Sequence, residues 1–183
     1  MALTYSTMMD LGTPAPDFSL PDTVSGKTLA LADLKSEVAT VVAFICNHCP
    51  YVHHLNRKLA EVAGIYQAQG VQFVGISSND VASYPQDAPE LMTQVAAREG
   101  YNFPYLYDET QEVAKAYGAE CTPDFFVFDS SLACVYRGRF DETRPGSGTA
   151  TGADLSGALD ALLAGNAVSV EQAPSMGCSI KWK

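Results

Sequence analysis

The chain has 183 residues, a length that suits one domain with a single hydrophobic core. Its formal net charge of −10, from 11 basic and 21 acidic residues, argues against nucleic acid or an anionic membrane as a partner. No apolar run reaches the ~18 residues of a membrane helix. The first residues lack the basic and apolar regions of a signal peptide. We therefore expect residues 1–183 to form one cytoplasmic domain.

The first half of the chain predicts a strand–helix–strand unit preceded by a hairpin. Residues 1–10 read as a loose arm, and residues 18–31 as a hairpin that turns at 22–26. Residues 38–45 form a continuous apolar, β-branched run, which is typical of a strand buried on both faces. Apolar residues then recur every three or four positions from Val52 to Tyr66, which indicates a helix. A second buried strand at 71–76 completes a parallel unit.

The second half predicts alternating helices and strands. After a polar loop at 77–89, the pattern indicates three helices and two antiparallel strands. The helices are expected at 89–99, 109–117 and 154–163, the strands at 125–128 and 132–136, and a tail at 168–183. The fold class is therefore α/β, with a central mixed β-sheet flanked by helices, an N-terminal β-hairpin and a C-terminal tail extension.

The motif Cys46-Asn47-His48-Cys49 lies between a buried strand and a helix, and it carries the chemistry that we predict. Two cysteines three positions apart on a first helical turn bring their sulfurs within bonding reach. A helix N-terminus favours a thiolate through its unpaired N–H groups and positive dipole end. Pro50 is compatible with that first turn. His48, if it lies near the Cys46 sulfur, would stabilise the thiolate further and make the disulfide a better oxidant.

The order of strand, C-x-x-C-P, helix, and then Thr122-Pro123 before a strand resembles the thioredoxin superfamily. Three segments narrow the resemblance to its redoxin branch, the AhpC/TSA or peroxiredoxin-like group: Gly12–Leu20, Cys121–Phe126 and the tail Gly177–Trp182. The resemblance implies a thioredoxin-like fold. It also implies an exposed attacking Cys46, a buried resolving Cys49 and a cis-proline at Pro123. The backbone of Thr122 would then pair with an extended substrate.

Two positions depart from the patterns of these relatives. Thioredoxins place a buried acid six residues before the first cysteine, and this chain has Thr40 there. Peroxiredoxins carry a Pro-x-x-x-Thr/Ser-x-x-Cys loop that holds peroxide, and neither cysteine of the motif is preceded by it. The sequence therefore shows no peroxide site and leaves the proton acceptor for the second cysteine open.

The remaining cysteines have separate interpretations. Cys121 adjoins the expected cis-proline, and Cys178 lies in the tail, so both are candidates for additional redox thiols, although an inert buried role is open for each. Cys134 lies in an expected strand and is most simply a small core residue. His53 and His54 lie on the helix after the motif, and we expect them to be packed or solvated.

The favoured function is a thiol–disulfide oxidoreductase that uses Cys46 and Cys49. Asn47, His48, Pro50, Thr122 and Pro123 are the expected supporting residues. The partners would be a disulfide-containing protein or a small thiol or peroxide substrate, with an unknown thiol as reductant. No organic cofactor and no metal are predicted. Two alternatives remain open: a peroxiredoxin-like thiol peroxidase, and a carrier of copper(I) held by Cys46, Cys49 and a histidine.

Overall fold

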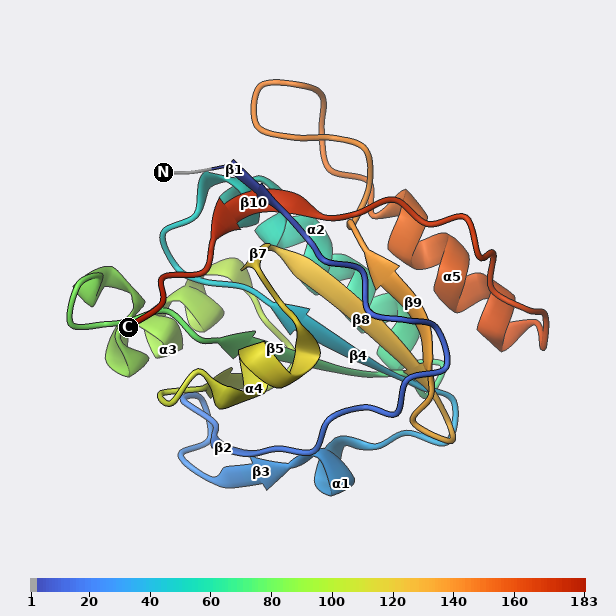
Figure 1. Ribbon diagram of the computed structural model, residues 1–183, viewed down its shortest axis with the longest axis horizontal. Coiled ribbons are helices and arrows are strands. Elements are labelled where there is room, and N and C mark those ends of the chain that lie inside the picture. Colours follow the sequence, from blue (N-terminus) through green and yellow to red (C-terminus); the bar gives the residue numbers. More distant parts are fainter. Residues whose placement is uncertain (1–2) are drawn as a thin grey trace.

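The computed structural model describes residues 3–183, and a five-stranded sheet with the order β6-β5-β4-β8-β9 forms its centre (Figure 1). Three of its strands run parallel: β4 (Ala39–Phe44), β5 (Gln72–Ser77) and β6 (Tyr105–Tyr107). The other two, β8 (Asp124–Asp129) and β9 (Cys134–Gly138), are antiparallel. The predicted mixed sheet is therefore confirmed, and β6 is a strand that the sequence pattern did not indicate.

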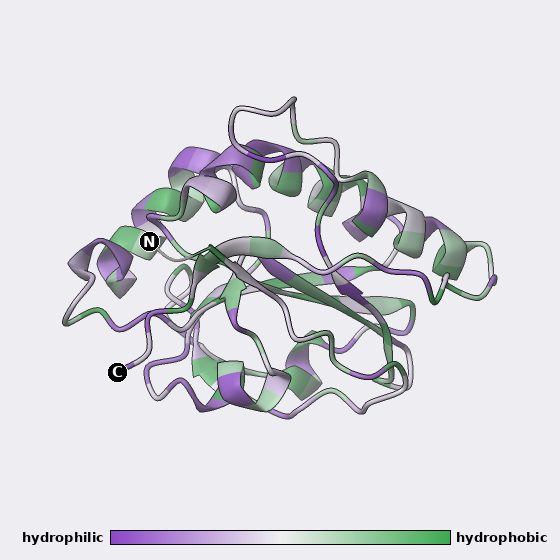
Figure 2. Ribbon diagram, turned by 45° about the horizontal axis from the view of Figure 1, so that its top comes forward, coloured by the Kyte–Doolittle hydropathy of each residue, from purple (hydrophilic) through white to green (hydrophobic). Residues whose placement is uncertain are grey.

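Helices cover both faces of this sheet (Figure 2). One face carries α2 (Pro50–Gln67), α3 (Pro89–Glu99) and α5 (Ala153–Leu163), whose apolar residues join one buried cluster. The opposite face carries α1 (Leu31–Leu34) and α4 (Glu112–Tyr117), which join a second cluster. In Figure 2 the hydrophobic colour is concentrated on the strands of the central sheet and on parts of the helices around them.

The continuous apolar run at 38–45 contains β4, the central strand of the sheet, which is buried on both faces. Successive side chains of a strand point to opposite faces of the sheet. Val41 and Ala43 accordingly belong to the α2 side of the core, whereas Val42 and Phe44 belong to the α4 side. All six residues of β4 are buried. The strand thus delivers the motif that follows it to one edge of a rigid sheet.

A second, three-stranded sheet has the order β1-β10-β7 and joins the two ends of the chain. Its strands are β1 (Leu3–Tyr5), β7 (Cys121–Thr122) and β10 (Met176–Ser179). In Figure 1 β1 and β10 lie side by side, close to the labelled start of α2. The predicted loose arm is wrong for residues 3–5, which form β1, whereas residues 6–10 have no regular secondary structure and residues 1–2 lie outside the described part. Three-residue strands are too short to show a periodicity of their own.

The predicted hairpin is confirmed as β2 (Ser19–Pro21) and β3 (Thr28–Ala30), which pair antiparallel. Two predicted starts shift by two or three residues, since α4 begins at Glu112 rather than at 109 and β9 begins at Cys134 rather than at 132. The predicted polar loop at 77–89 contains a 3-10 turn, η1 (Pro85–Asp87), and much of it is buried. Among the described residues, no helix is long and apolar enough to cross a membrane.

Candidate active site

The cysteine motif occupies the loop between β4 and α2. Cys49 is the N-cap of α2, with φ −74° and ψ 123°, and the helix begins at Pro50. The carbonyl of Cys49 accepts the first helical hydrogen bond, from the N–H of His53 at 2.9 Å. The motif therefore precedes the helix, which corrects the prediction that both cysteines lie on its first turn. Proline stands at the first helical position, where its missing N–H leaves no hydrogen bond unmade.

Both sulfurs of the motif contact Thr122. Cys46 Sγ lies 3.3 Å from Thr122 Oγ1, and Cys49 Sγ donates to the Thr122 carbonyl at 3.2 Å. The peptide bond between Thr122 and Pro123 is cis, as predicted. The predicted pairing of the Thr122 backbone with a substrate is contradicted in this conformation, because strand β10 already occupies that edge with Cys178 opposite Thr122. The tail of the chain takes the position expected for a substrate segment.

The motif is buried, and the prediction of an exposed Cys46 is wrong. Cys46 is 2% exposed and Cys49 is 0% exposed. The side chain of Thr122 lies against Cys46, a carboxylate oxygen of Asp87 lies within 4.8 Å of its sulfur, and strand β10 pairs over Thr122. The spacing of the cysteine motif does not indicate where the tail or the loop after β5 lies, so the sequence could not predict this burial. Access to either sulfur requires that one of these covering segments moves.

Asp87 is a site residue that the sequence reasoning missed. It is fully buried and accepts three hydrogen bonds: from Asn47 N–H at 2.8 Å, from His48 Nδ1 at 2.6 Å and from Asn79 Nδ2 at 2.8 Å. The sequence did contain a signal for the polar loop after β5, which carries Asp87. The carboxyl ends of parallel strands meet at one edge of a sheet, so polar residues after β5 are expected near a motif after β4. Nothing in the sequence singled out Asp87 within that loop.

His48 is held between two partners. Its ring stacks on Tyr84, with centroids 5.3 Å apart and an interplanar angle of 11°, and its Nδ1 is bonded to Asp87. A ring nitrogen of His48, the Cys46 sulfur and a carboxylate oxygen of Asp87 all lie within 4.8 Å of one another. His48 Nε2 is buried and has no hydrogen-bond partner among the described residues. His48 therefore lies near the Cys46 sulfur, as the stated hypothesis requires.

Asn47 fixes the loop from its other side. Its side-chain amide donates to the carbonyl of Gln86 at 3.0 Å, and its side-chain oxygen accepts from the Tyr105 hydroxyl at 3.1 Å. His53 Nε2 bonds the carbonyl of Asn47 at 2.5 Å. Together with the bond from its N–H to Asp87, these contacts use every polar group of Asn47. The loop is therefore rigidly oriented before any substrate arrives.

The thiol pair shares one hydrogen bond, and this bond separates the two pKa values. The hydrogen bond with Cys49, then burial, then the charge of Asp87 raise the pKa of Cys46. The hydrogen bond from Cys46, together with bonds from Cys178 and the Val52 N–H, lowers the pKa of Cys49 to about 5 against burial. These directions favour a thiolate on Cys49, and the Cys46 thiolate expected from the sequence stays a prediction. A thiolate on Cys49 would accept the hydrogen bonds from Cys46 and Cys178 and would no longer donate to the Thr122 carbonyl.

Thr40 has a structural role, which agrees with the prediction that it cannot serve as a buried acid. Its hydroxyl accepts from the Ser36 N–H at 3.1 Å and donates to the Leu34 carbonyl at 3.4 Å. The buried acid nearest in sequence to the cis-proline is Asp124, which pairs across the sheet with Phe44. Burial raises the pKa of Asp124 well above its ordinary value. This carboxyl lies at the first residue of β8, directly after the cis-proline.

The three other cysteines lie in different environments. Cys121 is fully buried, its Sγ bonds the Pro123 carbonyl at 3.8 Å, and burial raises its pKa. Cys134 belongs to the cluster on the α4 side of the sheet, which fits its predicted place in the core. Cys178 lies in the same buried cluster as Cys46 and Cys49 and is hydrogen-bonded to Cys49. The fold thus brings one of the two candidate additional thiols directly onto the pair.

A metal would find three ligand atoms here, on Cys46, His48 and Asp87. Their ligand atoms all lie within 4.8 Å of one another, and in the described part of the chain this is the one group of at least three such ligands. This set differs from the predicted one, because Asp87 rather than Cys49 is the third member. A carboxylate is a hard ligand that suits copper(I) poorly, and His48 Nδ1 is already bonded to Asp87. The arrangement therefore favours thiol chemistry over copper transport.

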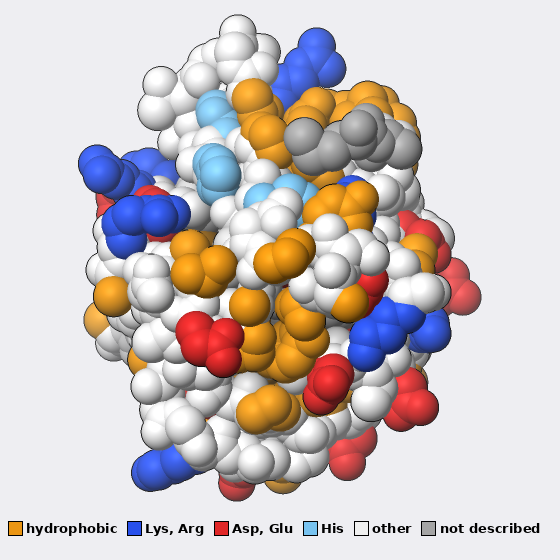
Figure 3. All heavy atoms as spheres, turned by 90° about the vertical axis from the view of Figure 1, so that its left-hand side faces the viewer, with side chains coloured by type: hydrophobic (Ala, Val, Ile, Leu, Met, Phe, Trp, Pro, Cys, Tyr) orange, Lys and Arg blue, Asp and Glu red, His pale blue; other side chains and the backbone are white. Residues whose placement is uncertain are grey.

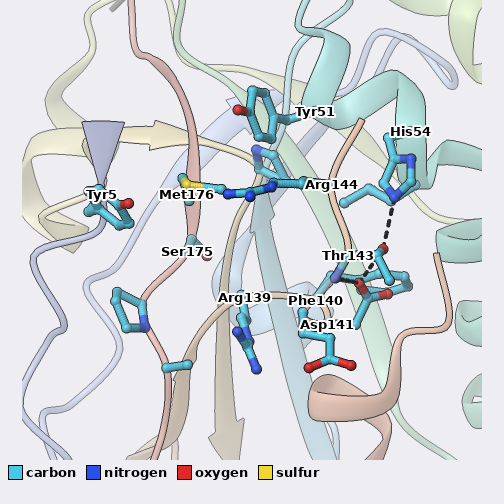
Figure 4. A pocket seen from close by; sticks show the side chains of 15 residues that line it. Tyr5, Tyr51, His54, Arg139, Phe140, Asp141, Thr143, Arg144, Ser175 and Met176 are labelled. Atoms are coloured by element: carbon cyan, nitrogen blue, oxygen red, sulfur yellow. Dashed lines mark hydrogen bonds between the residues drawn. The ribbon is translucent and has the colours of Figure 1, made fainter. Parts of the chain in front are cut away.

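A cavity of about 290 Å³ lies beside the site (Figure 4). Its lining includes Pro123 of the cis peptide, Tyr51 at the start of α2 and Met176 of β10. Figure 4 shows Arg144 below Tyr51, with its guanidinium toward Met176, and His54 bonded to Thr143; the His54 Nε2–Thr143 Oγ1 distance is 2.8 Å. On the molecular face in Figure 3, histidine side chains gather among hydrophobic ones. The cavity reaches the cis-proline, but neither Cys46 nor Cys49 lines it.

The comparisons with known proteins agree with this geometry. An uncharacterized conserved protein from Geobacillus kaustophilus has the same fold with a TM-score of 0.98 and 54% identity, covering 100% of this chain and 97% of that one. A hypothetical protein from Sinorhizobium meliloti gives 0.95 and 49%, covering 98% of each chain. The thiol-disulfide oxidoreductase ResA of Geobacillus thermodenitrificans is 28% identical over 129 residues, which are 70% of this chain and 68% of that protein.

The family model matches over the part of the chain that contains the site. Solved disulfide oxidoreductases at lower identity share the thioredoxin-like fold of this chain. The model of the AhpC/TSA family matches residues 11–136, which include the cysteine motif, Asp87 and the cis-proline. That span is more than half of the sequence. The chain belongs to the AhpC/TSA family, in the redoxin branch of the thioredoxin superfamily.

Proposed function

We propose that this protein is a thiol–disulfide oxidoreductase that uses Cys46 and Cys49. The observation that carries the proposal is the convergence of both sulfurs on Thr122, at 3.3 and 3.2 Å, together with the hydrogen bond that they share. One thiol of such a pair can ionise at neutral pH while the other stays in reach to close a disulfide. Membership of a family of thiol oxidoreductases and peroxidases supports this assignment.

The shared proton explains how a buried Cys46 becomes the nucleophile. Cys46 passes its proton to the Cys49 thiolate along their hydrogen bond and attacks one sulfur of the substrate disulfide. The other substrate sulfur leaves as a thiolate and takes a proton from solvent. Cys49 then attacks Cys46 in the mixed disulfide and gives its proton to the second leaving thiolate. Two thiols of the protein are oxidised, and one substrate disulfide is reduced to two thiols.

A small disulfide is the substrate class that the site favours. Strand β10 occupies the edge of β7 where an extended peptide would pair, so a protein substrate would first have to displace it. The cavity beside Pro123, at about 290 Å³, is near the lower end of the sizes usual for small-molecule sites. Its wall includes Arg144, which can donate hydrogen bonds to a carboxylate of the ligand, whereas Arg139 is already paired with Asp154.

The test is a single-turnover reaction of the fully reduced protein with oxidised glutathione, a small carboxylate-bearing disulfide. Samples are quenched with acid, alkylated and mapped by mass spectrometry. Wild type should form the Cys46–Cys49 disulfide, and Cys49→Ser should accumulate glutathione on Cys46. Cys134→Ser is the matched control, because that cysteine is equally buried but lies on the other side of the sheet. Reduction of the disulfide by Cys46→Ser at the wild-type rate would reject the proposal.

Peroxidase activity is the competing outcome of the same experiment with hydrogen peroxide. Reactive cysteines need electropositive surroundings that stabilise a thiolate. The nearest charged side chain to Cys46 that acts on its pKa is instead Asp87, which raises it. We therefore expect peroxide to oxidise the protein far more slowly than oxidised glutathione. The opposite order of rates would favour the peroxidase.

A further inference from the structure

The side chain of Cys178, on the C-terminal strand β10, faces the thiol pair. Residues directly opposite each other in an antiparallel ladder have their side chains on the same face. Cys178 of β10 is opposite Thr122 of β7, and the Thr122 hydroxyl faces Cys46 at 3.3 Å. The next pair of the ladder, Ser179 and Cys121, points to the other face. The register therefore selects Cys178, and not Cys121, as the thiol that faces the site.

The position of this strand is closely specified. Gly177 lies so near β7 that a Cβ atom there would stand 2.0 Å from the Thr122 carbonyl oxygen and 3.3 Å from Pro123 Cδ. On its other edge β10 pairs with β1, where Leu3 is opposite Cys178. Cys178 is consequently 4% exposed and packs in the cluster that contains Cys46 and Cys49. Only a glycine before the cysteine allows the strand to approach so closely.

Cys178 and Cys49 are in direct contact. Their side chains are hydrogen-bonded, and this bond is one of those that stabilise the Cys49 thiolate. Burial, followed by the same bond, raises the pKa of Cys178 to about 12, so Cys178 is the donor. Three sulfurs thus form a chain in which Cys49 is bonded to Cys46 on one side and to Cys178 on the other. Cys49 is therefore the sulfur through which Cys46 and Cys178 are connected.

We propose that Cys178 is a third redox thiol of this centre, which takes over the disulfide from Cys46. This step rests on the proposed function, because it starts from the Cys46–Cys49 disulfide. The Cys178 sulfur attacks Cys49 Sγ, the Cys49–Cys178 bond forms and the Cys46–Cys49 bond breaks. The proton of Cys178 passes to the departing Cys46 sulfur. One disulfide and one thiol are present before and after, so no external oxidant or reductant is consumed.

The exchange has a consequence for the cycle. Cys46, the sulfur that meets the substrate, returns to the thiol form while the oxidising equivalents are held between α2 and the C-terminal strand. A thiol reductant would then act on the tail strand rather than in the substrate cavity. Substrate and reductant therefore need not compete for one entrance.

The experiment maps disulfides after limited oxidation, with a readout that is independent of the substrate. Reduced wild type, Cys46→Ala, Cys178→Ala and the control Cys121→Ala are treated with diamide, a diazene that removes two hydrogens from a pair of thiols. Remaining thiols are alkylated in acid-quenched, unfolded protein, and linked peptides are identified by mass spectrometry. Circular dichroism of each reduced variant verifies that it is folded.

The proposal expects a Cys49–Cys178 link in Cys46→Ala and its loss in Cys178→Ala, with wild-type linkage in Cys121→Ala. In singly oxidised wild type, alkylation should shift with time from Cys178 to Cys46. Folded Cys46→Ala without a Cys49–Cys178 link, or wild type in which Cys178 stays the alkylated thiol, overturns it. Failure of the proposed function is separate, since it would appear as no reaction with oxidised glutathione while diamide still forms the link.

Discussion

The pH dependence of the reduction potential reports directly on the shared proton of the thiol pair. Reduction of a disulfide takes up two protons when both products are thiols, and one proton when one product remains a thiolate. Because the hydrogen bonds on Cys49 lower its pKa to about 5, the reduced pair should hold a single proton at neutral pH. The raised pKa of Cys46 keeps that proton in place at higher pH.

The magnitude follows from the two-electron couple. The potential should fall by about 30 mV per pH unit above pH 5, and by about 59 mV per unit below it, since a tenfold change in the equilibrium constant is 29.6 mV. At pH 7, lowering the first pKa from 9.0 to about 5 stabilises the reduced pair about a hundredfold, which corresponds to about 60 mV. The protein should therefore be more oxidising by that amount than a pair of ordinary thiols.

The assay equilibrates the protein with glutathione buffers from pH 4 to pH 8 and quantifies reduced and oxidised forms after acid quenching. Cys121, Cys134 and Cys178 are replaced by serine so that only the pair exchanges, and a serine at 178 retains a hydrogen-bond donor. A constant slope of about 59 mV per pH unit across the range would refute the reasoning, because both thiols would then keep their protons.

Three further predictions concern the residues around the pair. His48→Ala removes a hydrogen bond that offsets the negative charge of Asp87 near the thiol pair, so the thiolate of the reduced pair should be destabilised and the potential at pH 7 should become more reducing by about 30 mV, one tenfold change; an unchanged potential rejects the role of His48. Gly177→Ala places a Cβ against the Thr122 carbonyl, and denaturant unfolding should show a loss of about 1–3 kcal/mol. It should also speed alkylation of the pair, and unaltered stability and alkylation would contradict the close approach of β10. Asp124→Asn removes a buried carboxyl whose pKa is raised in the folded state, so wild type loses stability as pH rises above the unfolded pKa. The free energy of unfolding of the variant should rise relative to that of wild type by up to about 1.4 kcal/mol per pH unit from pH 4 upward, measured by unfolding at several pH values. A difference between the two free energies that does not change with pH would show that Asp124 is ionised.

The strand, motif and helix could be read from the sequence because each depends on neighbours in the chain. The run at 38–45 alternates between two buried faces, so only apolar residues fit, and β4 forms there. The apolar steps after Val52 give the buried face of α2. The proline at 123 was expected to be cis from the resemblance, and it is. These features are local, or they are fixed by a short motif.

The composition of the site depends on contacts between distant segments, and here prediction failed. Asp87 reaches Asn47 across 40 positions, and the tail reaches Thr122 across more than 50. The burial of Cys46 and the opposite pKa shifts of the two thiols both depend on such contacts. A helix N-terminus alone would have favoured a thiolate at the first cysteine. The hydrogen bond between the two thiols, followed by burial of Cys46 and the charge of Asp87, acts against that preference.

A buried pair of sulfurs is compatible with rapid chemistry only if the cover is less stable than the fold. The ladder between β10 and β7 has two residue pairs, whereas that between β4 and β8 has six. Strand β1, on the outer edge of the cover, exposes more than half of the surface of Leu3 and of Tyr5. Segments with few buried contacts open locally at a lower free energy than the core. The central sheet can thus hold the motif rigid while the terminal strands open, and a disulfide between Cys49 and Cys178 would hold that cover closed until it is reduced.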